Sequence, residues 1–239
     1  MLAARRGALL EAAGADIARL FGVRHRVVEA DLSVEGFINP LAAAIEDLDI
    51  GLVVSNAGGA SPGLFLGKER DGLIRNLRLN TLAHLEIAHH FGEKLAARKS
   101  GGLLLVGAMG ASIGIPYMAN DSGAKAYVHS LGEALHVELK PLGVHVSVLA
   151  TAPTETAVLA EFGLTPETMS MKPMRVDQCV SEALRALGRN RSMIVPGWLN
   201  RVMNAVVPAS VLRAVMANTF GKSLADRPTE TSRRATAVG

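Results

Sequence analysis

The stretch that most constrains the fold of this chain runs from Gly101 to Leu139. Two glycines open an apolar run, Leu103 to Val106, whose length is typical of a fully buried parallel strand. A loop of small residues follows. Asn120 or Asp121 is then predicted to cap a helix in which apolar residues recur at helical spacing. The stretch therefore predicts a strand, a loop and a long helix.

Strand and helix patterns alternate along the rest of the chain. Helices are predicted at residues 7–21, 34–48, 68–98 and 176–187, the third with an interruption near Arg75 and Asn76, and strands at residues 23–32, 50–55, 144–149 and 192–195. This alternation is typical of right-handed βαβ units and a parallel sheet. One domain is predicted over residues 1–221, with two apolar helices in 198–221 that are split at Pro208, and residues 222–239 are expected to form a disordered tail.

Composition and charge argue against several classes of function. The formal charge is only +3, and no basic block is interleaved with aromatic residues, so nucleic-acid binding is not expected. The single cysteine, Cys179, excludes an internal disulfide and indicates a reducing cytoplasm. No apolar run is long enough to span a bilayer. The seven histidines show no ligand spacing with one another or with the cysteine, so no metal site is predicted.

Short motifs occur in order from residue 1 to about residue 197: Arg5-Arg6, Asp31-Leu32, Asn56-Ala57-Gly58, Asn80, Lys125 and Pro153-Thr154-Glu155-Thr156. In this order and at this spacing they resemble the motifs of the short-chain dehydrogenase/reductase family. The resemblance implies an α/β fold, a Rossmann-like doubly wound parallel sheet between two layers of helices. It also implies NADP(H) as cofactor. By the resemblance, Arg5 and Arg6 would bind the 2′-phosphate, and Asp31 and Leu32 would contact the adenine. Asn56, Ala57 and Gly58 would form a turn beside the cofactor, Lys125 would bind the ribose, and Thr156 would lie near the nicotinamide.

One part of the family pattern has no counterpart in residues 1–239. In the family, a first strand leads into a glycine-rich loop that opens a helix, where backbone N–H groups and the helix dipole hold the pyrophosphate. The present sequence begins at the end of the second strand, so we expect the fold to lack this first βα unit. Because that strand is central in the family's sheet, two strand edges are expected to lack partners.

The family's catalytic positions are only half retained. Its asparagine and lysine fall on Asn80 and Lys125, whereas Ala108 and Asp121 replace its serine and tyrosine. The family tyrosine acts as general acid and base because the neighbouring lysine lowers its phenol pKa. A carboxylic acid titrates near ~4, so Asp121 is expected to be ionised at pH 7 and, as a base, to be mismatched by ~4 kcal/mol. An alanine side chain can donate no hydrogen bond.

Structural roles are open for most of these residues. Asp121 could satisfy free N–H groups at a helix start and pair with Lys125 four residues later. Asn80 fits a residue at a helix kink, and Arg5 and Arg6 could either bind a phosphate or be merely solvated. Neither Tyr117 nor Ser112 is expected to substitute for the missing groups, because both are displaced along the sequence.

The sequence therefore predicts a family member derived from enzymes that oxidise alcohols or reduce carbonyls, and impaired in catalysis. The expected substrate is a small apolar alcohol or carbonyl compound, such as a steroid or a fatty-acyl carbonyl. Two alternatives stay open: an active enzyme whose start site is misplaced, and a non-catalytic partner of an intact paralogue. Residues 198–221 are expected to form a substrate lid or a contact in a homo- or hetero-oligomer. Membrane docking is not expected, because Arg201, Pro208 and Arg213 interrupt the apolar run.

Overall fold

The computed structural model describes residues 1–156, 159 and 172–225. Its strands are all parallel and form two pieces of sheet, in the orders β1-β2 and β3-β4-β5-β6. The strands are β1 (Leu2–Ala4), β2 (Val27–Glu29), β3 (Leu52–Ser55), β4 (Gly101–Ala108), β5 (Val144–Thr151) and β6 (Met193–Ile194). In register, Leu52 lies opposite Gly102 and Gly101 opposite Val144.

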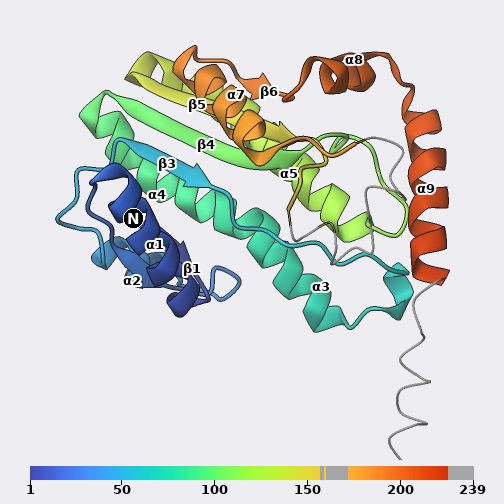
Figure 1. Ribbon diagram of the computed structural model, residues 1–239, viewed down its shortest axis with the longest axis horizontal. Helices are drawn as coiled ribbons and strands as arrows, with labels where there is room; N and C mark the ends of the chain where they lie inside the picture. The colour runs from blue at the N-terminus through green and yellow to red at the C-terminus, as the bar shows by residue number, and fades with distance from the viewer. Residues whose placement is uncertain (157–158, 160–171, 226–239) are drawn as a thin grey trace, which may run out of the picture.

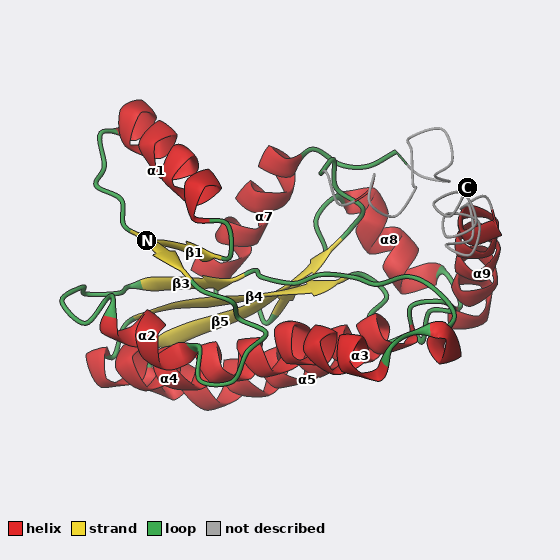
Figure 2. Ribbon diagram, turned by 90° about the horizontal axis from the view of Figure 1, so that it is seen from below, coloured by secondary structure: helices red, strands yellow, loops and turns green. Residues whose placement is uncertain are grey.

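Helices cover both faces of the strands, which confirms the predicted three-layer arrangement (Figure 2). One face carries α1 (Gly7–Phe21) and α7 (Val176–Gly188). The other carries α2 (Ile38–Ala43), α3 (Arg70–Leu77), α4 (Ala83–Arg98) and α5 (Ala119–Leu139). The last two helices, α8 (Trp198–Val206) and α9 (Ala209–Ala225), lie at the end of the molecule toward which the strands of the larger sheet point (Figure 1).

The core is densest where β4 and β5 lie against α4 and α5. Leu103, Leu105, Val144 and Val146 are fully buried in one cluster with Leu95 and Val128. Burying a side chain of this size stabilises the fold by roughly 1.5–3 kcal/mol relative to exposure. The near-continuous apolar sequence of these strands follows from their burial on both faces.

The two pieces of sheet share one further core cluster. Ala3 of β1, Val28 of β2 and Val53 of β3 pack against one cluster of buried residues, which includes Ile87 and Phe91 of α4. Within the described residues, however, no backbone hydrogen bond joins β1 to β3. The facing edges of these two strands are therefore without ladder partners in the part of the chain that the structure describes.

Several predicted boundaries were wrong. The helix predicted at 34–48 contains only α2, because Gly36 has a positive φ of 77° and Pro40 has no N–H to donate. The strand predicted at 23–32 contains only β2. The helix at 68–98 is not broken near Arg75; it passes through a π-helical turn, Arg78–Leu82, between α3 and α4.

The start of α5 and the end of α9 also differ from the predictions. The first residue of α5 is Ala119, and its N-cap is Met118, which makes no side-chain cap, so neither Asn120 nor Asp121 caps the helix. Helix α9 continues to Ala225, past the predicted start of the tail at 222. The remainder of that tail lies outside the described residues. No helix among the described residues is both long and apolar enough to cross a membrane.

Candidate functional site

Three of the residues predicted for the site meet at the carboxyl ends of β3 and β4. A side chain on Gly58, just after β3, would place its Cβ 2.9 Å from the Oδ1 of Asn80 and 3.2 Å from the Nζ of Lys125. Only glycine therefore lets the backbone approach both polar groups this closely. The fold thus brings together three residues that the sequence predicted for one site. One lies in the loop after β3, one in the π turn and one in α5.

Asn80 is fully occupied by backbone contacts. Its Nδ2 donates to the carbonyl of Gly59 over 2.8 Å and to the carbonyl of Asn76 over 3.0 Å, and its Oδ1 accepts the N–H of Gly59 over 3.2 Å. The side chain has no exposed surface and lies in the π turn, where a widened backbone leaves polar groups to be satisfied. In this geometry Asn80 fixes the loop after β3 to the π turn.

Asp121 is buried and is held by two other segments. Its Oδ2 accepts the N–H of Ser61 over 3.2 Å, and its Oδ1 accepts the Nδ2 of Asn76 over 3.0 Å. Asn76 is held in turn by Asn120, whose Nδ2 donates to its Oδ1 over 2.8 Å. Asp121 thus ties the start of α5 to the loop after β3 and to α3.

Lys125 does not form the predicted ion pair with Asp121. Its Nζ donates instead to the carbonyl of Val106 in β4 over 3.0 Å, and no contact within 4 Å joins it to the carboxylate. Burial lowers the pKa of Lys125 to about 8, although the charge of Asp121 acts in the opposite direction. The result is a cation in a weakly polar environment, held by one carbonyl.

A buried histidine stands close to this cation, and the sequence analysis missed it. His84 of α4 has no exposed surface, and its Nδ1 lies 2.8 Å from the Oγ of Ser55 in β3. Its Nε2 has no hydrogen-bond partner among the described residues. Burial, together with the charge of Lys125, lowers the pKa of His84 to about 3, so the ring is neutral at pH 7. The signal available in sequence was a histidine four residues after Asn80, on the buried side of α4.

Ala108, which the sequence analysis matched to the family's serine, ends β4 and presents only a methyl group. Its N–H points to the Nε2 of His129, 3.4 Å away, and burial lowers the pKa of His129. Tyr117 does not fill the gap, because its ring lies against Gly221 of α9. Ser112 is exposed. Among the described residues, no tyrosine or serine hydroxyl forms a hydrogen bond with Lys125.

The residues predicted for the adenosine end lie after β1 and β2. Arg5 and Arg6 are exposed, and Leu32 is buried in the core. The Oδ1 of Asp31 accepts the N–H of Ser33 over 2.9 Å and its hydroxyl over 2.6 Å. These hydrogen bonds, with smaller contributions from Arg5 and Arg75, lower the pKa of Asp31.

The other predicted cofactor residues follow the carboxyl ends of β3 and β5 in the larger sheet. Asn56 and Gly58 are exposed, and Ala57 is partly buried in the core cluster beside α4. Thr156 is exposed and belongs to the last described segment before residue 157. The residues just after it lie outside the described part of the chain.

The described residues fit NADP(H) only at its two ends. The two arginines and Asp31 could hold the phosphorylated adenosine, and Gly58 and Lys125 lie where the fold could receive the other end. In such folds the N-terminus of a helix holds the pyrophosphate of a dinucleotide. Between β1 and β3, however, no described helix presents its N-terminus for this purpose. No hydride-transfer step can therefore be derived from these residues alone.

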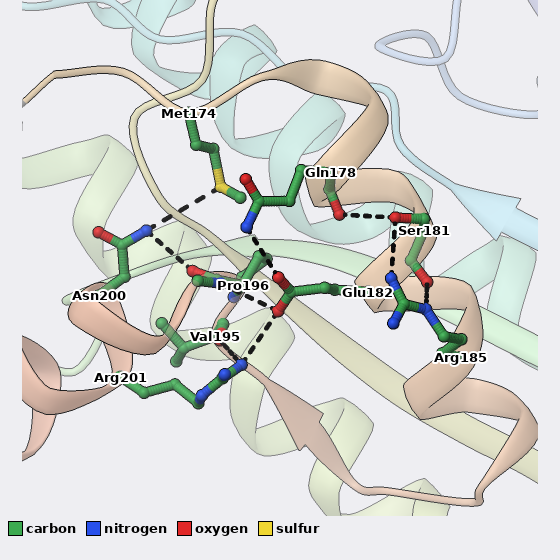
Figure 3. A network of polar contacts seen from close by, with 10 residues as sticks. Met174, Gln178, Ser181, Glu182, Arg185, Val195, Pro196, Asn200 and Arg201 are labelled. Carbon is green, nitrogen blue, oxygen red and sulfur yellow. Dashed lines mark hydrogen bonds and ion pairs between the residues drawn. The ribbon is translucent and has the colours of Figure 1, made fainter.

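The start of α8 is fixed to α7 by a polar network around Glu182 (Figure 3). Its Oε2 accepts the N–H of Gly197 and the Nη1 of Arg201, each over 3.0 Å, and its Oε1 accepts the Nε2 of Gln178 over 3.0 Å. Burial alone would raise the pKa of Glu182, but these donors outweigh it and lower the pKa. The sequence analysis did not detect this network, which joins α7 to the start of α8.

Farther along, α9 contacts the loop after β4. The Nε of Arg213 donates to the carbonyl of Gly114 over 3.3 Å, and a side chain on Gly110 would touch Leu212. Among the described residues, no group of three or more His, Cys, Asp or Glu side chains is placed to hold a metal ion.

The chain is similar in sequence to several known proteins. A family model described as short chain dehydrogenase matches residues 1–166. The very-long-chain 3-oxoacyl-CoA reductase of Neurospora crassa is 32% identical over 178 residues, which are 72% of this chain and 52% of that protein. The 7β-hydroxysteroid dehydrogenase of Collinsella aerofaciens is 27% identical over 197 residues, 81% of this chain and 75% of that protein.

Solved structures show the same fold. A short-chain dehydrogenase from Sphingobium yanoikuyae in complex with NADPH has a TM-score of 0.76 at 25% identity, covering 95% of this chain and 86% of that one. A 7β-hydroxysteroid dehydrogenase has a TM-score of 0.80 at 24% identity, covering 90% of this chain and 85% of that one. The chain thus spans about half the length of the Neurospora reductase and a larger share of the dehydrogenases.

Proposed function

Since the chain belongs to the short-chain dehydrogenase family, we propose that it derives from NADP(H)-dependent enzymes that interconvert alcohols and carbonyls, and that residues 1–239 turn over such pairs slowly or not at all. The observation that carries this proposal is the pair of hydrogen bonds accepted by the Asp121 side chain. A carboxylate occupies the acid–base position, and both its oxygens are engaged by Ser61 and Asn76.

The chemistry of carbonyl reduction supports the same conclusion. A carbonyl that accepts hydride needs a hydrogen-bond donor at its oxygen and a proton for the alkoxide that forms. The described site offers neither from its two replaced positions, because Ala108 has no hydroxyl and Asp121 is an acceptor when ionised. Lys125 is protonated below a pKa of about 8, and one of its three N–H groups donates to the carbonyl of Val106.

The ancestral substrate that we propose is a small apolar carbonyl or alcohol compound. The names of two relatives support this class, one a hydroxysteroid dehydrogenase and the other a 3-oxoacyl-CoA reductase. Apolar side chains of α8 and α9 at the carboxyl ends of the strands are also consistent with it. We further propose association with family subunits, identical or different, and a cytoplasmic location, the latter because the single cysteine is a free thiol.

The test is a measurement of NADPH oxidation by the purified chain with a ketosteroid and a 3-oxoacyl-CoA thioester, beside calorimetric binding of NADPH. We expect no turnover above the enzyme-free rate. Robust NADPH-dependent turnover by the unaltered chain would sink the proposal.

Two variants sharpen the result. Asp121→Asn keeps the size of the side chain and removes its charge, so it identifies any activity that depends on the carboxylate. The double change Ala108→Ser with Asp121→Tyr restores both family groups. If the double variant gains turnover and the unaltered chain has none, the loss lies at these two positions and not in cofactor binding.

A further inference from the structure

The amino group of Lys125 has few hydrogen-bond partners in this structure. Its Nζ donates to the carbonyl of Val106 over 3.0 Å, the one hydrogen bond that it makes to the described residues. The carboxylate of Asp121, four residues earlier in α5, accepts instead from the N–H of Ser61 and from Asn76. Because an ammonium group has three N–H donors, two of those on Lys125 are left without a partner in the part of the chain that the structure describes.

The amine lies where a small molecule can approach it. Strand β3 ends at Ser55, opposite Leu105, so Val106 lies beyond the paired part of β3 and β4. A Cβ on Gly58, in the loop after β3, would lie 3.2 Å from the Nζ of Lys125. Gly58 is exposed, and Lys125 itself is only partly buried. The absence of a side chain at residue 58 therefore leaves the Nζ open to a ligand from the solvent side of this loop.

The groups around Lys125 favour its neutral form. Burial lowers the pKa of Lys125 to about 8, and the charge of Asp121 only partly opposes this effect. The pKa values of His84 in α4 and His129 in α5 are lowered as well, mainly by burial, so both rings are neutral at pH 8. At this pH about half of the Lys125 side chains are neutral, against ~0.4% of a solvated lysine that titrates near ~10.4.

A neutral lysine amine can do chemistry that an ammonium cannot. Its lone pair is free to attack a carbonyl carbon, whereas in the ammonium a proton occupies that lone pair. A lysine that is desolvated in this way is the group that forms Schiff bases with carbonyl compounds in proteins. An aldehyde suits the approach past Gly58 better than a ketone, because its carbonyl carbon carries a hydrogen in place of a second substituent.

We propose that Lys125 condenses with a small aldehyde to form an imine. The lone pair of the Nζ attacks the carbonyl carbon, a C–N bond forms, and one proton of the nitrogen passes to the oxygen. The carbinolamine then loses its hydroxyl group together with the second nitrogen proton as water, so one amine and one aldehyde give one imine and one water. No nicotinamide takes part, so a failure of this proposal leaves the proposed function untouched.

Two neighbours fit the intermediates of this reaction. The Nε2 of His84 has no hydrogen-bond partner among the described residues, and the ring is close enough for the charge of Lys125 to lower its pKa. It is therefore a hydrogen-bonding group available to the hydroxyl of the carbinolamine. The negative charge of Asp121, which acts on the ammonium of Lys125, also favours the protonated imine.

The first experiment incubates residues 1–239 with hexanal at pH 8 and quenches with sodium borohydride, which reduces an imine to a stable secondary amine. Peptide mass spectrometry then locates the hexyl groups, with the exposed Lys94 and Lys140 as internal controls. We expect Lys125 to be labelled at least tenfold faster than either. This ratio is below the ~100-fold ratio of neutral fractions, because a less basic amine is a weaker nucleophile. Labelling of Lys125 at the rate of the controls, or slower, would overturn the proposal.

The second experiment repeats the labelling from pH 6 to pH 10. The rate at Lys125 should rise up to about pH 8 and then level off, because the amine is by then largely neutral. The rate at Lys94 should continue to rise to pH 10. Parallel profiles at the two lysines would refute the proposal.

Two glycine substitutions test the approach to the amine. Gly58→Ala puts a methyl group against the Nζ and should slow the labelling of Lys125 at least tenfold, with Lys94 unchanged. Gly72→Ala, in α3, meets nothing within 4 Å and should leave both rates unchanged. Thermal melting shows whether each variant is folded. Unaltered labelling of Lys125 in a folded Gly58→Ala protein would contradict the proposal, and if that variant does not fold, the rate ratio and the pH profile of the unaltered chain decide.

Discussion

Acid should destabilise this protein through one buried histidine. The neutral ring of His84 has a pKa of about 3 in the folded chain, against ~6.5 in an unfolded one. Below pH ~6.5 the unfolded state therefore binds a proton that the folded state does not bind, so the free energy of unfolding falls as pH falls. Linkage over these two values gives a loss of ~2 kcal/mol between pH 7.5 and pH 5.0, and the loss continues until pH approaches 3.

The assay is urea unfolding at pH 7.5 and pH 5.0 of the unaltered chain and of His84→Gln. The glutamine can keep a hydrogen bond to Ser55 and does not titrate, so the other histidines cancel in the comparison. We expect the pH dependence of the variant to be smaller by ~2 kcal/mol. Equal pH dependence in both proteins, or a His84 ring that titrates near pH 6.5 by NMR, would refute the reasoning.

Three further predictions concern other buried groups. Burial lowers the pKa of Lys125 to about 8, so between pH 8 and pH 10.5 the unfolded chain keeps a proton that the folded chain has lost. The free energy of unfolding should therefore rise by up to ~3 kcal/mol over this range. In urea titrations at the two pH values, Lys125→Met should lack that rise. Glu182→Gln should cost about 2 kcal/mol and speed hydrogen exchange in α8, whereas Asp16→Asn, in an exposed pair, should cost under ~0.5 kcal/mol; equal costs would contradict the role given to the network. Gly143→Ala should cost over ~1 kcal/mol by thermal melting, since φ is 78° and a Cβ would collide with a backbone carbonyl, while Gly188→Ala meets nothing within 4 Å and should be near neutral.

Periodicity located β5 and α7, because apolar spacing records which side of an element faces the core: the predictions for 144–149 and 176–187 fall within these elements. The predicted helix 7–21 also matches α1, although Gly14 is the only buried residue of that helix. Periodicity failed for 34–48, where Gly36 and Pro40 disturb the backbone locally. Such boundaries depend on single residues and not on the pattern.

The candidate site was predictable in membership but not in contacts. Motif spacing placed Gly58, Asn80 and Lys125 together, and the fold does so. The spacing could not show that Lys125 bonds to β4 and not to Asp121, because an i,i+4 pair competes with partners from distant segments. The hydrogen bond between His84 and Ser55 could not be predicted from the sequence either, since 29 residues separate them along the chain.

By itself, the sequence determined that strands and helices alternate and that the sheet is parallel, and it predicted from the resemblance that Asp121 and Ala108 stand in place of two catalytic side chains. Those features follow from local spacing and from residue chemistry. Only the tertiary structure decided which groups each buried polar side chain contacts. These contacts depend on how segments far apart in the chain are packed against one another, and burial sets the energy of each of them.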